Sequence, residues 1–173
     1  MSRVDVVCYT SKHCNLRCRY CYEHPLLADK SRMSLPQIER MFSHFHEYYS
    51  RLERPVDMRF QWHGGEPLLI EPEYYWKVFE TQRRIFDGTP HRIKNIVQTN
   101  MTVLDDERIA LLRDGFDEAG VSLDLYSGLR VNKRGLCMEN RAIANLERAR
   151  AAGIELSGIT VLTRPLLGRI ADV

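Results

Sequence analysis

Strand-like and helix-like segments alternate along the whole of this 173-residue chain. Alternating apolar residues such as Met58, Phe60 and Trp62 are typical of strands. Apolar residues at helical spacing follow Ser34, which is placed to cap a helix with Pro36 in its first turn. The pattern predicts strands over 4–10, 58–62, 93–99, 121–125 and 155–163, and helices over 34–52, 75–86, 105–116 and 138–152, the last closed by Gly153.

Five strand–helix units joined by short connections predict parallel strands with right-handed crossovers, in either a doubly wound sheet or a barrel. In both architectures the chemistry lies beyond the carboxyl ends of the strands. The informative polar residues of this chain fall there. They are the cysteines after the first strand, Gly64-Gly65-Glu66 after the second, Gln98-Thr99-Asn100 at the third, and Ser122 and Asp124 at the fourth.

Composition sets the broad class. Hydrophobic residues make up 44% of the chain and charged residues 28%, which is ordinary for one globular domain. The formal net charge of +2 indicates no broad nucleic-acid surface. No apolar run reaches the roughly 18 residues of a membrane span, and Met1 to Val7 does not resemble a secretory signal. We therefore expect a cytoplasmic protein that does not bind membranes or nucleic acid.

Three of the five cysteines, Cys14, Cys18 and Cys21, lie within eight residues directly after the first predicted strand. In a reducing compartment, clustered thiols indicate metal binding or catalysis. A cuboidal 4Fe–4S cluster normally takes four cysteine ligands, so three would leave one iron open to a small molecule. Zinc is the alternative, with Cys8, His13 or His24 as a fourth ligand, but the chain has no second cysteine pair. The spacing favours iron–sulfur.

A di-glycine followed by an acid, Gly64-Gly65-Glu66, closes the second predicted strand. Glycine lets the backbone approach a ligand closely, and the Glu66 carboxylate could accept hydrogen bonds from an ammonium group. Alone, the motif is more typical of a turn with a solvated acid. Beside a three-thiol site we favour the ligand-binding interpretation.

Together these motifs resemble the radical S-adenosylmethionine (SAM) superfamily, and most closely its SPASM-type branch of anaerobic sulfatase-maturating enzymes and ribosomal-peptide maturases. The similar runs, in the family's order, are 14–22 (CNLRCRYCY), 62–69 (WHGGEPLL), 97–100 (VQTN), 120–124 (GVSLD) and 159–163 (ITVLT). The resemblance covers essentially the whole chain. It implies an α/β fold, a partial (β/α)6 TIM-like barrel with about five units present.

The resemblance also implies a role for individual residues. Cys14, Cys18 and Cys21 would ligate a 4Fe–4S cluster whose open iron binds SAM. Glu66, with Gly64 and Gly65, would receive the SAM ammonium. The other implied cofactor contacts are Tyr20 beside the adenine, Ser122 and Arg134 at the carboxylate or ribose, Asn100 near the ribose, and Val161 against the adenine. For Arg134 the alternative is a surface cation among Arg130, Lys133 and Arg141.

In such enzymes the reduced cluster cleaves SAM to a 5′-deoxyadenosyl radical, which abstracts hydrogen from a substrate. The implied partners are a peptide or protein substrate and a one-electron reductant of the flavodoxin or ferredoxin type. We expect apolar inward faces of the strands to exclude water from this chemistry. Two alternatives stay open: a non-catalytic fragment that binds cluster and SAM, and a zinc-stabilised α/β domain.

Two departures from the family pattern limit what can be carried over. Asp124 is followed by residues 125–128 (LYSG) where relatives have Gly-Pro, and Arg130-Val131 stands where His-Asp is expected. The second departure is length. We expect residues 1–173 to be a radical SAM core domain that is incomplete at its C-terminus, with a fifth helix due at about Arg169 and no SPASM region.

Overall fold

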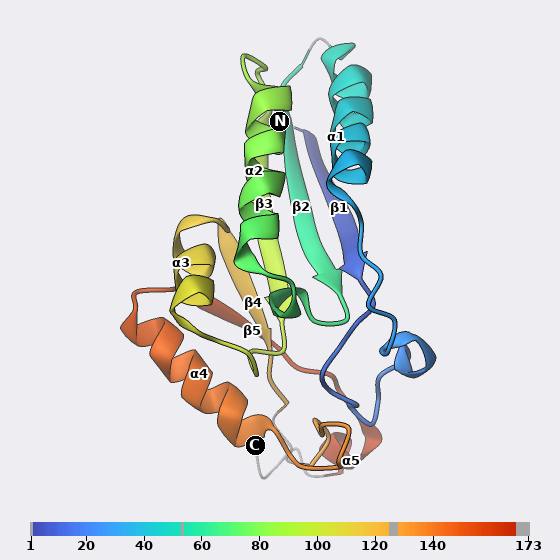
Figure 1. Ribbon diagram of the computed structural model, residues 1–173, viewed down its shortest axis with the longest axis vertical. Coiled ribbons are helices and arrows are strands. Elements are labelled where there is room, and N and C mark those ends of the chain that lie inside the picture. Colours follow the sequence, from blue (N-terminus) through green and yellow to red (C-terminus); the bar gives the residue numbers. More distant parts are fainter. Residues whose placement is uncertain (1, 53, 125–127, 169–173) are drawn as a thin grey trace.

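The computed structural model describes residues 2–52, 54–124 and 128–168. Its centre is a single sheet of five parallel strands in the order β1-β2-β3-β4-β5 (Figure 1). The strands are β1 (Ser2–Ser11), β2 (Val56–Gly64), β3 (Arg92–Thr99), β4 (Glu118–Ser122) and β5 (Leu156–Ile159). A doubly wound sheet reverses its strand order, whereas a barrel keeps it sequential. The sequential order therefore decides for the partial TIM-like barrel.

A helix follows each strand, as predicted. The helices are α1 (Leu35–Ser50), α2 (Pro72–Phe86), α3 (Asp106–Asp114), α4 (Glu139–Ala151) and the short α5 (Arg164–Leu167), with single 3₁₀ turns η1 (His24–Leu26) and η2 (Pro67–Leu69). Ser34 and Gln37 form a capping box at the start of α1, and the Asp105 carboxylate accepts a hydrogen bond from the Arg108 N–H at the start of α3. Gly88 and Gly153 adopt positive φ angles just after α2 and α4.

The hydrophobic core lies between the sheet and the helices that cover its outer face. Alternate residues of β2 (Val56, Met58, Phe60 and Trp62) are fully buried there, and the Phe42 ring of α1 meets the rings of Phe60 and Trp62 edge-on. Burying side chains of this size contributes about 1.5–3 kcal/mol each. The indole N–H of Trp62 donates to the Asn95 side chain at 2.9 Å, so its polar atom is satisfied inside the core.

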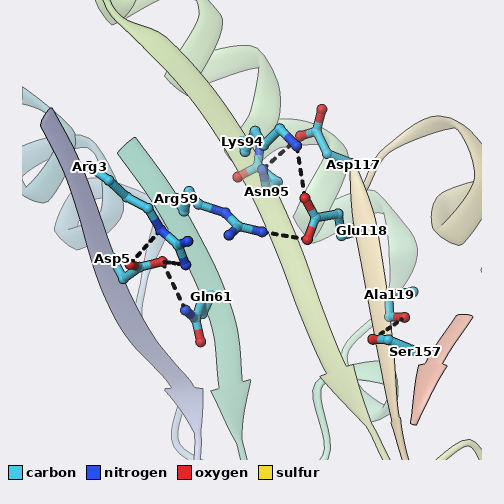
Figure 2. Close-up of polar contacts among 10 residues, drawn as sticks. All are labelled: Arg3, Asp5, Arg59, Gln61, Lys94, Asn95, Asp117, Glu118, Ala119 and Ser157. Carbon is cyan, nitrogen blue, oxygen red and sulfur yellow. Dashed lines mark hydrogen bonds and ion pairs between the residues drawn. The ribbon is translucent and has the colours of Figure 1, made fainter. Parts of the chain in front are cut away.

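The opposite, concave face of the sheet is more polar than expected. Figure 2 shows a charged row across it: the Glu118 carboxylate of β4 pairs with Arg59 of β2 and, at 2.8 Å, with Lys94 of β3. On β1, Asp5 accepts hydrogen bonds from Arg3 and from Gln61. The row lies nearer the amino ends of the strands, and Val7 and Tyr9 follow it along β1 toward the carboxyl end. The expectation of apolar inward faces was therefore wrong for this part of the sheet.

Three predicted boundaries also differ. β4 spans Glu118–Ser122 instead of 121–125, because its pairing with β3 begins where Glu118 meets Ile96. β5 is shorter than predicted since its neighbour β4 has only five residues to pair with. A helix, α5, already begins at Arg164, whereas Leu125 and residues 169–173 lie outside the described part. Within that part, no helix combines the length and apolar character needed to cross a bilayer.

Candidate functional site

The cysteine loop leaves the carboxyl end of β1 and runs to η1. Cys14 is buried with Leu16 and Leu27 in a small cluster, against which Cys18 and Cys21 pack from their half-buried positions. The Cys14 N–H donates to the Leu27 carbonyl at 3.1 Å, and the Cys21 N–H donates to the Cys18 carbonyl at 3.0 Å. These bonds fold the loop back on itself and gather the three thiols on one short stretch.

A distant segment holds the other side of this loop. The Arg17 N–H donates to the Val131 carbonyl at 2.6 Å, and the Arg19 N–H donates to the Leu129 carbonyl at 2.9 Å. Leu16 and Asn132 also form an antiparallel bridge. In this short ladder Cys18 lies opposite Arg130, although the two are more than a hundred residues apart in the chain.

Arg130 is completely buried at 1% exposure. One of its terminal nitrogens, Nη2, donates to the Asn100 carbonyl, whereas Nε and Nη1 have no partner among the described residues. Burial raises the pKa of the Cys18 thiol, and the Arg130 charge acts in the opposite direction. A buried guanidinium with free N–H groups is costly unless an anion completes it. The site is therefore built to receive a negatively charged group.

The thiol of Cys14 is buried close to that of Cys18. Burial raises the pKa of Cys14 to about 11, and the neighbouring Cys18 charge acts in the same direction. Iron binding would offset this cost, because a metal displaces the thiol proton. Among the described residues, no three Cys, His, Asp or Glu side chains converge tightly enough for a single ion. Three cysteines can each ligate a different iron of one 4Fe–4S cluster and leave the fourth iron open, whereas structural zinc normally takes four protein ligands, so the donor set fits a cluster.

The two remaining cysteines lie elsewhere. Cys8 is buried on the helix-facing side of β1, where burial raises its pKa to about 12. Cys137 is exposed and contacts the Glu139 carboxylate at the start of α4.

Gly64 and Gly65 are required by the approach of the cysteine loop. A Cβ on Gly64 would lie 2.1 Å from the Ser11 carbonyl oxygen, and one on Gly65 would lie 2.2 Å from that of His13. Gly64 also has φ +128°, a conformation that favours glycine. The N–H groups of Gly65 and Glu66 donate to the Ser11 and His13 carbonyls at 2.9 and 2.8 Å. The di-glycine thus clamps the end of β2 to the loop that carries the thiols.

Glu66 is buried at 2% exposure, which excludes the solvated-turn interpretation. Its Oε1 accepts hydrogen bonds from the Thr99 hydroxyl at 2.6 Å and from the Leu68 N–H at 2.9 Å, while Oε2 accepts one from the Asn100 N–H at 2.6 Å. Burial raises the pKa of this carboxyl, and the three donors act against the rise. Glu66 therefore ties β2 to the end of β3 and keeps capacity for one further donor at Oε2.

Asn100 connects the third strand to the thiol loop. Its amide nitrogen lies 3.0 Å from the Asn15 side-chain oxygen and 3.7 Å from the Cys14 sulfur. Its side-chain oxygen accepts from the N–H and hydroxyl of Thr102 at 2.9 and 2.6 Å. The next residue, Met101, has φ +55°, a turn that lets Asn100 bond both Glu66 and Arg130 through its backbone.

Two further predicted residues lie at the same end of the sheet. The Tyr20 hydroxyl donates to the Asp124 carboxylate at 2.6 Å, which joins the cysteine loop to the segment after β4. Burial and this bond raise the pKa of Tyr20. Ser122 ends β4, and its hydroxyl accepts from the Gln98 amide at 3.0 Å.

Arg134 and Val161 are not brought into this network. Arg134 is exposed on a turn before Gly135, and its side chain makes no hydrogen bond to another described residue. Val161 follows β5 and is 41% exposed. Sequence reasoning instead missed Arg130 as a site residue. The available signal was its position between Leu129 and Val131, because an arginine flanked by apolar residues can be drawn inward with them.

The chain was then compared with known proteins. A model of the radical SAM superfamily matches residues 8–166. A serine-type anaerobic sulfatase-maturating enzyme of Bacteroides thetaiotaomicron is 30% identical over 155 residues, covering 86% of this chain and 37% of that protein. A cysteine-type enzyme of the same name from Clostridium perfringens is 28% identical over 141 residues, covering 80% and 37%.

Solved structures agree on the fold. The structure described as native anSMEcpe with bound AdoMet has a TM-score of 0.82 at 24% identity, covering 99% of this chain and 47% of that one. HydG, a maturase of the [FeFe]-hydrogenase, has a TM-score of 0.65 at 14% identity, covering 92% and 35%.

This chain spans less than half the length of each of these proteins. The matching family model covers nearly all of it, and the family is one that uses a 4Fe–4S cluster and SAM, the two cofactors predicted from the sequence. The chain belongs to the radical SAM superfamily.

Proposed function

We propose that the protein to which this chain belongs uses a 4Fe–4S cluster and SAM to remove a hydrogen atom from a residue of a peptide or protein. The observation that carries the proposal is the joining of the three-cysteine loop to the ends of β2 and β3. Gly64 and Gly65 clamp it to β2, and Asn100 reaches Cys14 from β3 while its backbone holds Glu66 and Arg130. A site only for zinc would not require a buried cation with free N–H groups.

Cys14, Cys18 and Cys21 would hold the cluster, as proposed from the sequence. Arg130 would take the SAM carboxylate through N–H groups of its guanidinium, in the role first assigned to Arg134. That role suits arginine because its side chain is always charged and offers several N–H donors to an anion.

The other contacts to SAM would come from residues at or near the carboxyl ends of the strands. The SAM ammonium would lie against the Gly64–Glu66 turn and use the free capacity of Glu66 Oε2. Ser122 and Asn100 would lie near the ribose, with Tyr20 and Val161 beside the adenine.

Once bound, the cluster and SAM together supply a 5′-deoxyadenosyl radical, which does the hydrogen abstraction. The residues of this chain place and shield that chemistry. Burial of Glu66 and Arg130 excludes water from the polar side of the site. Tyr9 and Tyr22, whose hydroxyls are 2.7 Å apart, present aromatic surface near the cysteine loop on the concave face.

The substrate class follows from the relatives. Two are named sulfatase-maturating enzymes, and a second structure of anSMEcpe is described with bound AdoMet and a peptide, Cp18Cys. We infer a peptide or protein substrate on this basis. A one-electron reductant of the flavodoxin or ferredoxin type would supply the electron.

Anaerobic reconstitution with iron and sulfide tests the proposal. We expect broad visible absorption that dithionite bleaches, a reduced-cluster electron paramagnetic resonance signal that changes when SAM is added, and formation of 5′-deoxyadenosine. Replacement of Cys14, Cys18 or Cys21 by alanine should remove the cluster, whereas Cys137→Ala should keep it. A colourless protein that binds stoichiometric zinc instead would overturn the proposal.

SAM cleavage without hydrogen transfer is the other outcome to resolve. A deuterated substrate peptide should pass its label to 5′-deoxyadenosine in the full-length protein. Full cluster occupancy and tight SAM binding with no cleavage would assign the non-catalytic binding role instead.

A further inference from the structure

The outer side of the cysteine loop carries cations from three separate segments. Lys12 lies just before the loop, Lys30 follows η1, and Lys133 and Arg134 belong to the turn before α4. All four side chains are exposed. We call them the cationic rim.

Adjoining depressions connect the rim around His13, the residue next to Cys14. His13, Asn15, Lys133 and Arg134 line one of them. Lys30 and Arg32 line a second together with His13, and Lys12 with Arg32 lines a third. The cations therefore surround the point where the thiol loop reaches the surface.

The four cations of the rim lie around one loop and are not neutralised by ion pairs with other described residues. Ten ion pairs join described residues, and none includes a residue of the rim. Three carboxylates line these depressions: Asp29, which accepts hydrogen bonds from the neighbouring Ser31, the buried Glu66, and Glu71. Glu71 nearby is paired with Arg32 at 2.8 Å. The net local charge is positive.

We propose that the cationic rim docks an acidic one-electron donor protein and delivers its electron to the cluster held by the adjacent loop. The proposal rests on the proposed function, since it needs a cluster. One electron leaves the donor's reduced flavin, which is oxidised, and the cluster is reduced by that electron. The rim surrounds His13, the neighbour of the proposed cluster ligand Cys14, so a donor docked on it would stand beside the cluster.

Charge complementarity decides the class of partner. Unpaired surface cations steer an acidic protein to its site and raise its association rate, and the effect is strongest at low salt. A formal net charge of +2 and a rim of four cations are too little for an extended nucleic-acid-binding surface.

The lysines of the chain offer a direct mapping experiment. There are five, of which Lys12, Lys30 and Lys133 belong to the rim, while Lys77 and Lys94 are paired with Glu73 and Glu118. A water-soluble carbodiimide joins lysine amines to carboxylates, so we use it to link a bacterial flavodoxin to the reconstituted protein. We expect mass spectrometry to find cross-links at the rim lysines. Cross-links confined to Lys77 or Lys94 would overturn the proposal.

Kinetics give the second readout. Hydroquinone flavodoxin should reduce the cluster of a Lys30→Glu/Lys133→Glu variant at least about tenfold more slowly than the wild-type cluster at low ionic strength. The two rates should converge as salt is raised to about 0.5 M. Arg40→Glu/Arg83→Glu makes the same charge change at exposed, unpaired positions on α1 and α2, and should match the wild type.

Dithionite separates the two proposals. It is small and needs no docking surface, so it should reduce the rim variant and the wild type at the same rate. If no preparation forms a reducible cluster, the proposed function fails. If dithionite reduces all of them and flavodoxin does not distinguish the rim variant from its control, the docking surface alone is wrong. Tighter rim-dependent binding of single-stranded RNA than of flavodoxin at 0.15 M salt would also overturn it.

Discussion

A guanidinium group buried beside thiols and a carboxylate is the residue-scale feature that most shapes this site. The charge of Arg130 influences the pKa values of Cys18, Tyr20 and Glu66, and two of its nitrogens have no hydrogen-bond partner in the part of the chain that the structure describes. An isolated buried charge is costly, so its position is best explained by an anion that binds there.

We predict that Arg130→Lys weakens SAM binding by about tenfold or more, because lysine keeps the charge but loses the fixed planar arrangement of the guanidinium N–H donors. The cluster content should stay unchanged. SAM titration of the reconstituted protein measures this, with Arg134→Ala as the comparison. A larger loss of affinity in the Arg134 variant would return that residue to the role expected from the sequence.

Glu66 makes a second residue-scale prediction. In Glu66→Gln, one carboxylate oxygen is replaced by an NH₂ group. In the wild-type protein both oxygens accept hydrogen bonds from backbone N–H or hydroxyl groups, so the new NH₂ group would face a donor. Urea unfolding of the cluster-free protein should show a loss of about 1–3 kcal/mol. SAM affinity of the loaded protein should also fall, by roughly ten- to a hundredfold. Glu71→Gln, at an exposed surface ion pair, should cost less than about 1 kcal/mol.

Equal free energies of unfolding for Glu66→Gln and Glu71→Gln would contradict the role of Glu66 in linking β2 to the end of β3. Unchanged SAM affinity with the expected loss of stability would make Glu66 a purely structural residue.

At the scale of elements, the site depends on how closely loops approach the ends of the strands. The cysteine loop contacts the Gly64–Gly65 turn through backbone atoms on both sides. Backbone cannot move aside as a flexible side chain can, so a methyl group there must displace the loop.

Gly65→Ala should therefore destabilise the protein by at least about 2 kcal/mol and lower the iron content after reconstitution. Gly158→Ala in β5 is the matched control, because nothing lies within 4 Å of its added Cβ and its φ is not in the left-handed range. Thermal unfolding and iron analysis of both variants provide the measurement. Wild-type stability and iron content in the Gly65 variant would show that the loop is not clamped.

At the scale of the whole molecule, the helix-covered face of the sheet carries the stability and the carboxyl ends carry the chemistry. Cys8 belongs to the first part. Burial raises its pKa from the ordinary 9.0 to about 12. The folded protein therefore keeps this proton at pH values where the unfolded chain loses it.

The sign follows from linkage. A raised acid pKa stabilises the fold fully below pH 9, and this contribution is lost as the pH rises toward 12. We expect stability to fall over this range, with Cys8 supplying up to about 1.4 kcal/mol per pH unit. In Cys8→Ala the slope of the unfolding free energy against pH, measured in cluster-free protein, should be shallower by that amount. The same slope in both proteins would show that Cys8 does not titrate with unfolding.

The sequence by itself determined the features that depend on near neighbours in the chain. The periodicity of apolar residues set the alternation of strands and helices, and Ser34 and Asp105 marked two helix starts through short-range caps. The cysteine spacing likewise predicted one loop with three thiols. These signals need only a few residues each, so they can be read without the fold.

Tertiary structure decided the remaining features of the site, because these features depend on contacts between segments that are distant in the sequence. Pairing of residues 16–19 with 129–132 selects Arg130 and leaves Arg134 outside. Hydrogen-bond donors at the end of β3 hold Glu66 inside the protein, whereas the sequence alone left it as a possible surface acid. Pairing with β3 also places the start of β4 at Glu118. Neither periodicity nor spacing carries this information, since each contact joins segments that are distant in the sequence and that only the folded sheet brings together.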